Sequence, residues 1–210
     1  MNAIGRVVPR LLAALVVAIG LVHGVFAQSA APAAAPRLPF AEWLAGVRTE
    51  ALSLGIRPEI VDEALGHLEQ PVTSVLERDR SQAEIVLPLE TYVSQHLKAA
   101  VVENARSMSA ANRALLDEVA ARYGVPPGII VAVWGLESNF GRFSGVRPTV
   151  AALATLAWAP RRSAFFRGEL MSALQILDRG DIDIARMRGS WAGAMGQPQF
   201  MPSSYLTWAV

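Results

Sequence analysis

The sequence predicts an all-α fold, because helical periodicity runs through almost the whole chain of 210 residues. Apolar residues recur every three to four positions, and the alternation that marks half-buried strands is nearly absent. Helix boundary signals agree with this pattern. Pro58 suits a first helical turn, Ser109 suits an N-cap, and Gly124 suits a helix end before two prolines. We expect helices at 39–54, 58–69, 71–78, 88–106, 109–123, 127–137, 149–157, 161–179 and 202–210.

The N-terminal segment has the composition of a secretory signal peptide. Arg6 and Arg10 precede the apolar stretch 11–25, and small or apolar residues stand before Gln28, where a signal peptidase would read them. The stretch is interrupted by His23 and is short for a membrane span, although a single anchor is the alternative. We therefore expect a signal peptide at 1–27, an Ala/Pro-rich linker at 28–37, a folded domain at 38–210, and a soluble periplasmic protein without a stable membrane anchor.

Composition and charge exclude several classes of function. The formal net charge is +1, which gives no reason to expect a nucleic-acid partner. The chain has no cysteine and therefore no disulfide, and its three histidines stand far apart in the sequence. It contains no glycine-rich phosphate loop and no His or Cys cluster with metal-ligand spacing. The sequence therefore predicts neither a cofactor nor a metal.

Glu137 is the candidate catalytic residue, since it ends the apolar run 128–137 and is followed by Ser-Asn-Phe-Gly. If this run is a helix that passes through a core, Glu137 emerges where the helix stops. Desolvation and the negative end of the helix dipole would then both favour the protonated carboxyl, which is the form of a general acid. The alternative is structural, with Glu137 paired to Arg142 or Arg147 in the turn.

Five arginines lie close together in the sequence after Glu137. Such a cluster either faces an anionic ligand or covers a solvated helix face, which is the commoner case. Its members are Arg142, Arg147, Arg161, Arg162 and Arg167.

A second unusual segment, 190–205, places small residues between aromatic residues and two amides. Small residues allow a backbone to approach a ligand closely. Gln197 and Gln199 can donate hydrogen bonds to sugar hydroxyls and accept hydrogen bonds from them, and the rings of Trp191, Phe200 and Tyr205 can stack on pyranose rings. A tight interhelical turn with ordinary core aromatics is the alternative.

Three motifs, at 125–141, 148–170 and 189–205, together carry a family resemblance. They resemble the lytic murein transglycosylase B family, enzymes with a lysozyme-like α-helical core that cleave the glycan strands of peptidoglycan. The resemblance implies a lysozyme-like helical domain at 38–210 that binds glycan strands, with cell-wall synthesis proteins among its further partners. Family members usually continue past the last matched residues, so it also implies that the C-terminal part of the domain is missing.

The resemblance assigns roles residue by residue. Glu137 matches the single catalytic acid/base, and Ser190 matches a serine that contacts the substrate near that acid. The implied glycan-binding residues are Gln199, Phe200, Arg161, Arg162 and, on a looser alignment, Tyr92. The chain departs from the family at Ser138, where threonine is common, and at Phe165, where tyrosine is frequent.

The lack of a second suitable acid shapes the implied reaction. Most glycosidases use two carboxylates. The nearby acids lie on or after a long helix and lack a comparable apolar setting; they are Glu169, Asp178, Asp181 and Asp183. The resemblance implies that Glu137 protonates the oxygen between N-acetylmuramic acid and N-acetylglucosamine, while the substrate's N-acetyl oxygen stabilises the cationic centre. Glu137 then takes the proton of the muramic 6-hydroxyl, which leaves a 1,6-anhydro end.

Two non-catalytic alternatives stay open. The chain could be a peptidoglycan-binding or scaffolding protein that keeps the groove without the chemistry. It could also be a helical periplasmic adaptor in which the segment 190–205 forms a protein interface.

Overall fold

The computed structural model describes residues 37–81 and 87–209, and these residues form ten helices and two short strands. The predicted all-α class is confirmed. The predicted signal peptide, and the predicted linker up to residue 36, lie outside the described residues. The elements are α1 (Phe40–Ser53), α2 (Pro58–Leu65), α3 (Thr73–Ser81), α4 (Leu89–His96), α5 (Ala99–Ala111), α6 (Arg113–Tyr123), α7 (Pro127–Ser138), β1 (Arg147–Pro148), α8 (Thr149–Trp158), α9 (Ser163–Arg179), β2 (Arg188–Gly189) and α10 (Pro202–Trp208).

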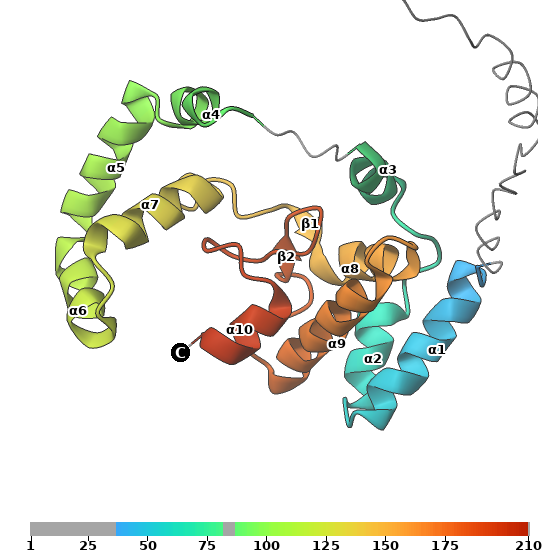
Figure 1. Ribbon diagram of the computed structural model, residues 1–210. Coiled ribbons are helices and arrows are strands. Elements are labelled where there is room, and N and C mark those ends of the chain that lie inside the picture. Colours follow the sequence, from blue (N-terminus) through green and yellow to red (C-terminus); the bar gives the residue numbers. More distant parts are fainter. Residues whose placement is uncertain (1–36, 82–86, 210) are drawn as a thin grey trace, which may run out of the picture. The chain divides into compact units, whose positions relative to one another are not determined.

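The main hydrophobic core surrounds the hairpin formed by α8 and α9, which lie along each other (Figure 1). Eight of the ten residues of α8 are buried, so this helix is enclosed on nearly all sides. On α9, Phe166, Leu170 and Leu174 follow one another at four-residue spacing and are fully buried. The last helix, α10, packs against α9.

The N-terminal helices pack on this hairpin. α1 and α2 contact each other and α8, and α3 also contacts α8. α1 buries Phe40, Leu44, Val47 and Ala51, whose spacing is that of one helix face. Pro58 opens α2 as predicted, at a position where its missing N–H removes no helical hydrogen bond.

A second, smaller apolar cluster joins α5, α6 and α7. Its buried members are Leu116, Val131 and Phe140. α6 ends at Gly124, whose φ of 71° is the left-handed conformation that glycine adopts without strain. The predicted helix end at this glycine is confirmed.

Two predicted boundaries in this region are wrong. The helix expected at 88–106 breaks at Leu97, whose φ of −100° and ψ of 53° are not helical. Ser109 lies inside α5, while Asn112 occupies the N-cap position of α6 and donates its side-chain N–H back to the carbonyl of Met108 (2.8 Å). Both serine and asparagine are common at caps, so composition did not separate them.

The two strands join segments that are distant in sequence. β1 pairs antiparallel with β2, with Arg147 opposite Gly189, and single bridges continue to Met195 and Phe200. The backbones approach so closely that a Cβ at Gly145 would lie 2.0 Å from the carbonyl carbon of Gly189. This ladder fixes the segment that follows α7 against the segment 189–200.

Among the described residues, no single helix is long and apolar enough to cross a membrane. α6 and α7 meet the length and composition criteria only as a pair, with a bend of 113° between them.

Candidate active site

Glu137 lies in the last turn of α7 and is exposed to solvent. α7 buries two of its 12 residues, whereas Ile129, Val133 and Leu136 are 56%, 46% and 55% exposed. The prediction that this helix passes through a core is therefore wrong for the described residues. The physical reason is that α7 packs on α5 and α6 along one side only, so the expected desolvation of Glu137 is not present.

Within the described part of the chain, Glu137 forms no ion pair. Pairing with Arg142 or Arg147 is thus not observed, and Arg147 instead donates a hydrogen bond to the hydroxyl of Ser74 (2.8 Å). A carboxylate without such a partner is available to exchange a proton with a bound ligand.

The turn 138–141, which follows the candidate acid, has an unusual backbone. Asn139, Phe140 and Gly141 have positive φ values of 48°, 59° and 82°, a region that residues other than glycine rarely adopt. The buried Ser138 hydroxyl holds this turn, since it accepts a hydrogen bond from the N–H of Gly141 (3.0 Å) and donates one to a carbonyl of the preceding helical turn (3.2 Å). Such strain persists where the surrounding structure enforces it, and it is concentrated at functional sites.

Two glutamines of the segment 189–205 form hydrogen bonds to the residues that flank this turn, one before it and one after it. Gln197 accepts a hydrogen bond from the indole Nε1 of Trp134 (2.6 Å), one turn before the candidate acid. Gln199 donates through Nε2 to the carbonyl of Ser144 (3.1 Å), after that acid, and to a carbonyl of its own hairpin (2.9 Å). The amide oxygen of Gln199 is therefore the part of this side chain that is left to meet a ligand.

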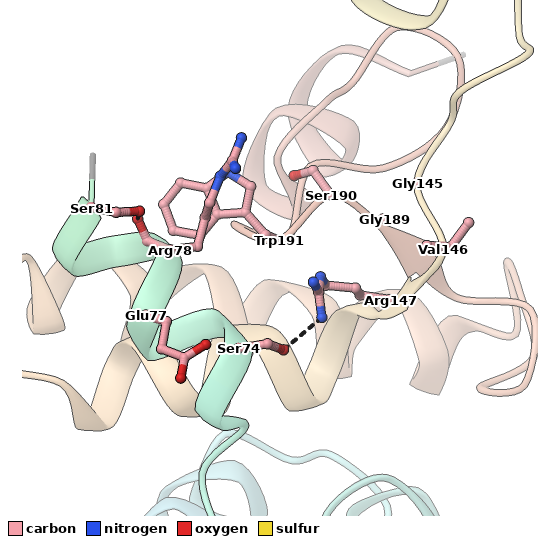
Figure 2. Close-up of a pocket in the computed structure, with 10 residues that line it drawn as sticks. All are labelled: Ser74, Glu77, Arg78, Ser81, Gly145, Val146, Arg147, Gly189, Ser190 and Trp191. Atoms are coloured by element: carbon pink, nitrogen blue, oxygen red, sulfur yellow. Dashed lines mark hydrogen bonds between the residues drawn. The ribbon is translucent and has the colours of Figure 1, made fainter. Parts of the chain in front are cut away.

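Ser190 starts a tight turn on the wall of a cavity of about 560 Å³, which α3 bounds on the other side (Figure 2). The Ser190 hydroxyl accepts hydrogen bonds from the N–H groups of Ala192 (3.3 Å) and Ala194 (3.1 Å). Gly193 has a φ of 89°, and a Cβ at this position would lie 2.4 Å from Leu153. The turn therefore requires glycine, and it presents Ser190 at a fixed place.

Phe200 faces a different cavity. Its backbone pairs with Met195 through two hydrogen bonds of 2.7 and 3.1 Å, which close the hairpin that carries Gln197 and Gln199. Its side chain lines a second cavity of about 620 Å³, together with Tyr205 from α10. The structure thus places Phe200 next to the glutamines in the chain, but in a cavity separate from that of Ser190.

The predicted arginine pair and Tyr92 lie elsewhere. Arg161 donates to the carbonyl of Asp79 at the end of α3 (3.1 Å), and the guanidinium of Arg162 lies 5.2 Å from the ring centroid of Phe166. Tyr92 stacks on a histidine of α4, with 4.1 Å between ring centroids. Among the described residues, no hydrogen bond, ion pair or ring contact joins these three predicted site residues to Glu137.

Two other acids, Glu169 and Asp178, hold neighbouring elements. Glu169 is only 4% exposed, which the sequence did not indicate, and its carboxylate accepts hydrogen bonds from the N–H (2.9 Å) and the hydroxyl (2.6 Å) of Ser203 at the start of α10. Asp178 accepts hydrogen bonds from the guanidinium (2.8 Å) and the N–H (3.1 Å) of Arg57. The side-chain hydrogen bond from Arg57 holds the pKa of Asp178 below its usual value.

Sequence reasoning missed two features of this region. It predicted that Gln197 contacts sugar hydroxyls and gave Trp134 no role in the site, but the two side chains hydrogen-bond to each other. Arg78, on α3, was not considered, although it faces the cavity of Ser190 (Figure 2). Its only sequence signal was the helical spacing that places it on one face with Ser74 and Ser81.

Comparison with known proteins assigns the family. A model of the transglycosylase SLT domain matches residues 39–210. The chain belongs to this family. Membrane-bound lytic murein transglycosylase B of Escherichia coli (strain K12) is 48% identical over 89 residues, which make up 42% of this chain and 25% of that protein. The resemblance drawn from the three motifs is thereby confirmed.

Solved structures of family members share the fold. SltB3 from Pseudomonas aeruginosa, in complex with NAG-NAM-pentapeptide, matches with a TM-score of 0.77 and 40% identity over 81% of this chain and 46% of that chain. SltB1 from the same organism matches with a TM-score of 0.74 and 32% identity over 80% of this chain and 57% of that chain. The Escherichia coli lytic transglycosylase Slt35, in complex with bulgecin A, matches with a TM-score of 0.70 and 32% identity over 82% of this chain and 55% of that chain. The lysozyme-like helical fold is confirmed, and the chain spans about half the length of these solved relatives.

Proposed function

We propose that this chain cleaves the glycan strands of peptidoglycan as a lytic transglycosylase, with Glu137 as its single acid and base. The observation that carries the proposal is the position of Glu137, which lies at the end of α7 without an ion-pair partner among the described residues and between the two contacts of Gln197 and Gln199. Family membership supports the reaction class. The NAG-NAM-pentapeptide complex of SltB3 supports glycan strands as the substrate class.

The proposed reaction consumes no water. Protonated Glu137 gives its proton to the glycosidic oxygen between N-acetylmuramic acid and N-acetylglucosamine, and the bond to the anomeric carbon breaks. The substrate's N-acetyl oxygen stabilises the cationic carbon. Ionised Glu137 then takes the proton of the 6-hydroxyl, whose oxygen bonds to the anomeric carbon and closes the 1,6-anhydro ring.

One carboxylate suffices for this sequence, because the same group first loses and then regains a proton. Two of the nearby acids, Glu169 and Asp178, are already held by hydrogen bonds from Ser203 and Arg57. A glycan strand bound over the exposed Glu137 would itself remove water from the carboxyl, which favours the protonated form.

The proposal extends to the place of action and to partners. Residues 1–27 have the composition of a cleaved signal, and the Escherichia coli relative is named a murein transglycosylase. We place the activity in the periplasm, where peptidoglycan is the substrate. Cell-wall synthesis proteins are the proposed protein partners.

The test replaces Glu137 by glutamine, which keeps the shape of the side chain and removes its acidity. Purified cell-wall sacculi are incubated with parent and Glu137→Gln protein, and the release of soluble muropeptides is followed. We expect a loss of at least about a hundredfold, the usual contribution of a general acid–base group. Glu118→Gln, a change on α6, is the matched control and should keep the parent rate.

Release by Glu137→Gln at the parent rate would refute the assignment of this residue. If the parent protein sediments with sacculi but releases nothing, the binding or scaffolding alternative holds instead. Independence of glycan binding from both Glu137 and Gln199 would favour the adaptor alternative.

A further inference from the structure

The cavity of Ser190 carries an arginine on each of two facing walls (Figure 2). Arg78 projects from α3, and Arg147 projects from β1. The hydrogen bond from Nη1 of Arg147 to the hydroxyl of Ser74 (2.8 Å) orients its guanidinium. Among the described residues, neither arginine forms an ion pair with a carboxylate. Two guanidinium groups thus line one cavity, and among the described residues the exposed Glu77 is the one carboxylate in its lining.

We propose that this cavity binds a carboxylate of the peptide carried by the glycan strand, with Arg78 and Arg147 as the recognising groups. The inference rests on the proposed function and adds to it a determinant of substrate choice. Guanidinium groups bind carboxylates through paired N–H donors, and such charge-assisted bonds are stronger than neutral ones. A pentapeptide ends in a carboxylate, and SltB3 has been solved with a glycan that carries one.

The other walls suit a peptide that is attached to a sugar. The cavity, of about 560 Å³, is within the size range of small-ligand sites. Ser190, the residue matched to glycan contact, lies on its wall, so a strand bound there would have its peptide close to the two arginines. Trp191, which packs on the main core and also lines the cavity, offers an apolar surface to aliphatic parts of the peptide.

Glu77 opposes the positive charge of the two arginines. It is exposed, precedes Arg78 on α3, and lines the same cavity. Its carboxylate would repel a bound carboxylate, so the proposal predicts opposite effects for two neighbouring changes. Removing the charge of Arg78 should weaken binding, and removing the charge of Glu77 should strengthen it.

The test uses two ligands that differ only in charge. One is NAG-NAM-pentapeptide, and the other is the same molecule with every peptide carboxylate converted to a primary amide. Dissociation constants are measured by titration calorimetry at low ionic strength for the parent chain, Arg78→Gln, Glu77→Gln, and the control Arg80→Gln. Arg80 lies on the same helix but is not among the residues that line the cavity.

We expect the parent to bind the carboxylate ligand roughly three- to tenfold more tightly than the amide ligand, as for partly exposed charge-assisted hydrogen bonds. Arg78→Gln should remove most of that preference without changing affinity for the amide ligand. Glu77→Gln should enlarge the preference, and Arg80→Gln should leave it unchanged. Arg147→Lys, which keeps the charge and loses the paired donors, should reduce it in part.

Equal affinity of the parent for the two ligands would overturn the inference while leaving the proposed function intact. A weaker preference in Glu77→Gln would also overturn it, because Glu77 would then support carboxylate binding instead of opposing it. Failure of the parent to bind either ligand would contradict the proposed function itself, and with it this inference.

Discussion

Trp134 and Gln197 form the contact that most directly holds the candidate acid. The indole of Trp134 lies three residues before Glu137, on the same helical turn, and its N–H bonds to an amide oxygen of the hairpin 195–200 (2.6 Å). Phe140 packs edge-on against the same indole, with 5.3 Å between ring centroids. A hydrogen bond therefore holds the last turn of α7 to the hairpin 195–200, and a ring contact holds it to the turn 138–141 that follows.

This hydrogen bond predicts a coupled loss of rate. Trp134→Phe removes the donor and Gln197→Leu removes the acceptor, so each should slow the release of muropeptides from sacculi by about tenfold, the effect of one lost hydrogen bond. The loss should appear in kcat rather than in KM. Because both changes remove one contact, the double variant should be no slower than the worse single variant.

Trp208→Phe, an exposed change in α10, is the control for the loss of an indole. Rates equal to that of the parent, or losses that multiply in the double variant, would show that the contact does not position Glu137.

At the scale of elements, two carboxylates join helices of the main core. Glu169 on α9 accepts both hydrogen bonds from Ser203 and thereby satisfies the N-terminal turn of α10. Asp178, also on α9, accepts hydrogen bonds from the backbone N–H and the guanidinium of Arg57, which precedes α2. These contacts hold the outer helices on the α8–α9 hairpin, and hence the hairpin 195–200 that precedes α10.

Glu169→Leu should destabilise the domain, because leucine has no acceptor for the N–H and the hydroxyl of Ser203. We expect the free energy of unfolding to fall by about 1–3 kcal/mol, the cost of a buried polar group without its partner. Urea denaturation followed by circular dichroism measures it. Glu42→Leu, an exposed change on α1, should be nearly neutral, and equal midpoints for the parent and Glu169→Leu would show that the buried carboxylate does not hold α10.

Asp178 predicts a pH-dependent contribution to stability. Since the hydrogen bond from the Arg57 side chain lowers the pKa of Asp178 in the folded state, its stabilisation is present above the unfolded pKa of about 3.9 and is lost as pH falls through the lower folded value. Asp178→Asn should therefore lower the midpoint of thermal unfolding at neutral pH, and the difference from the parent should shrink in acid. A difference that stays constant down to about pH 2 would contradict the ion-pair account. Asp117→Asn, in an exposed pair on α6, is the control.

The fold class of the whole molecule followed from the sequence, because helical spacing and the proline and glycine signals at helix ends act locally. Pro58 and Gly124 end or begin helices through their own backbone constraints, whatever surrounds them. The break at Leu97 carries no such signal. α7 is apolar all round in sequence, but its packing partners cover one side only, and no local pattern shows which side.

The sequence indicated candidate residues of the site but not their arrangement. Glu137, Ser190 and Gln199 were proposed from motifs, since motifs record residue types in order. The pairing of Trp134 with Gln197 joins residues 63 positions apart, and the entry of Arg78 into the cavity of Ser190 depends on how α3 packs on α8. Such contacts depend on tertiary structure, which spacing along the chain does not encode.

We propose that one carboxyl group, that of Glu137, breaks the glycan strand by ring closure. Mass analysis of the products that the parent chain releases from purified sacculi tests this reaction, with Glu137→Gln as the blank. We expect muropeptides that end in 1,6-anhydro-N-acetylmuramic acid and that are absent from the blank. Products with reducing ends, one water heavier, would contradict it, because they would show hydrolysis in place of ring closure.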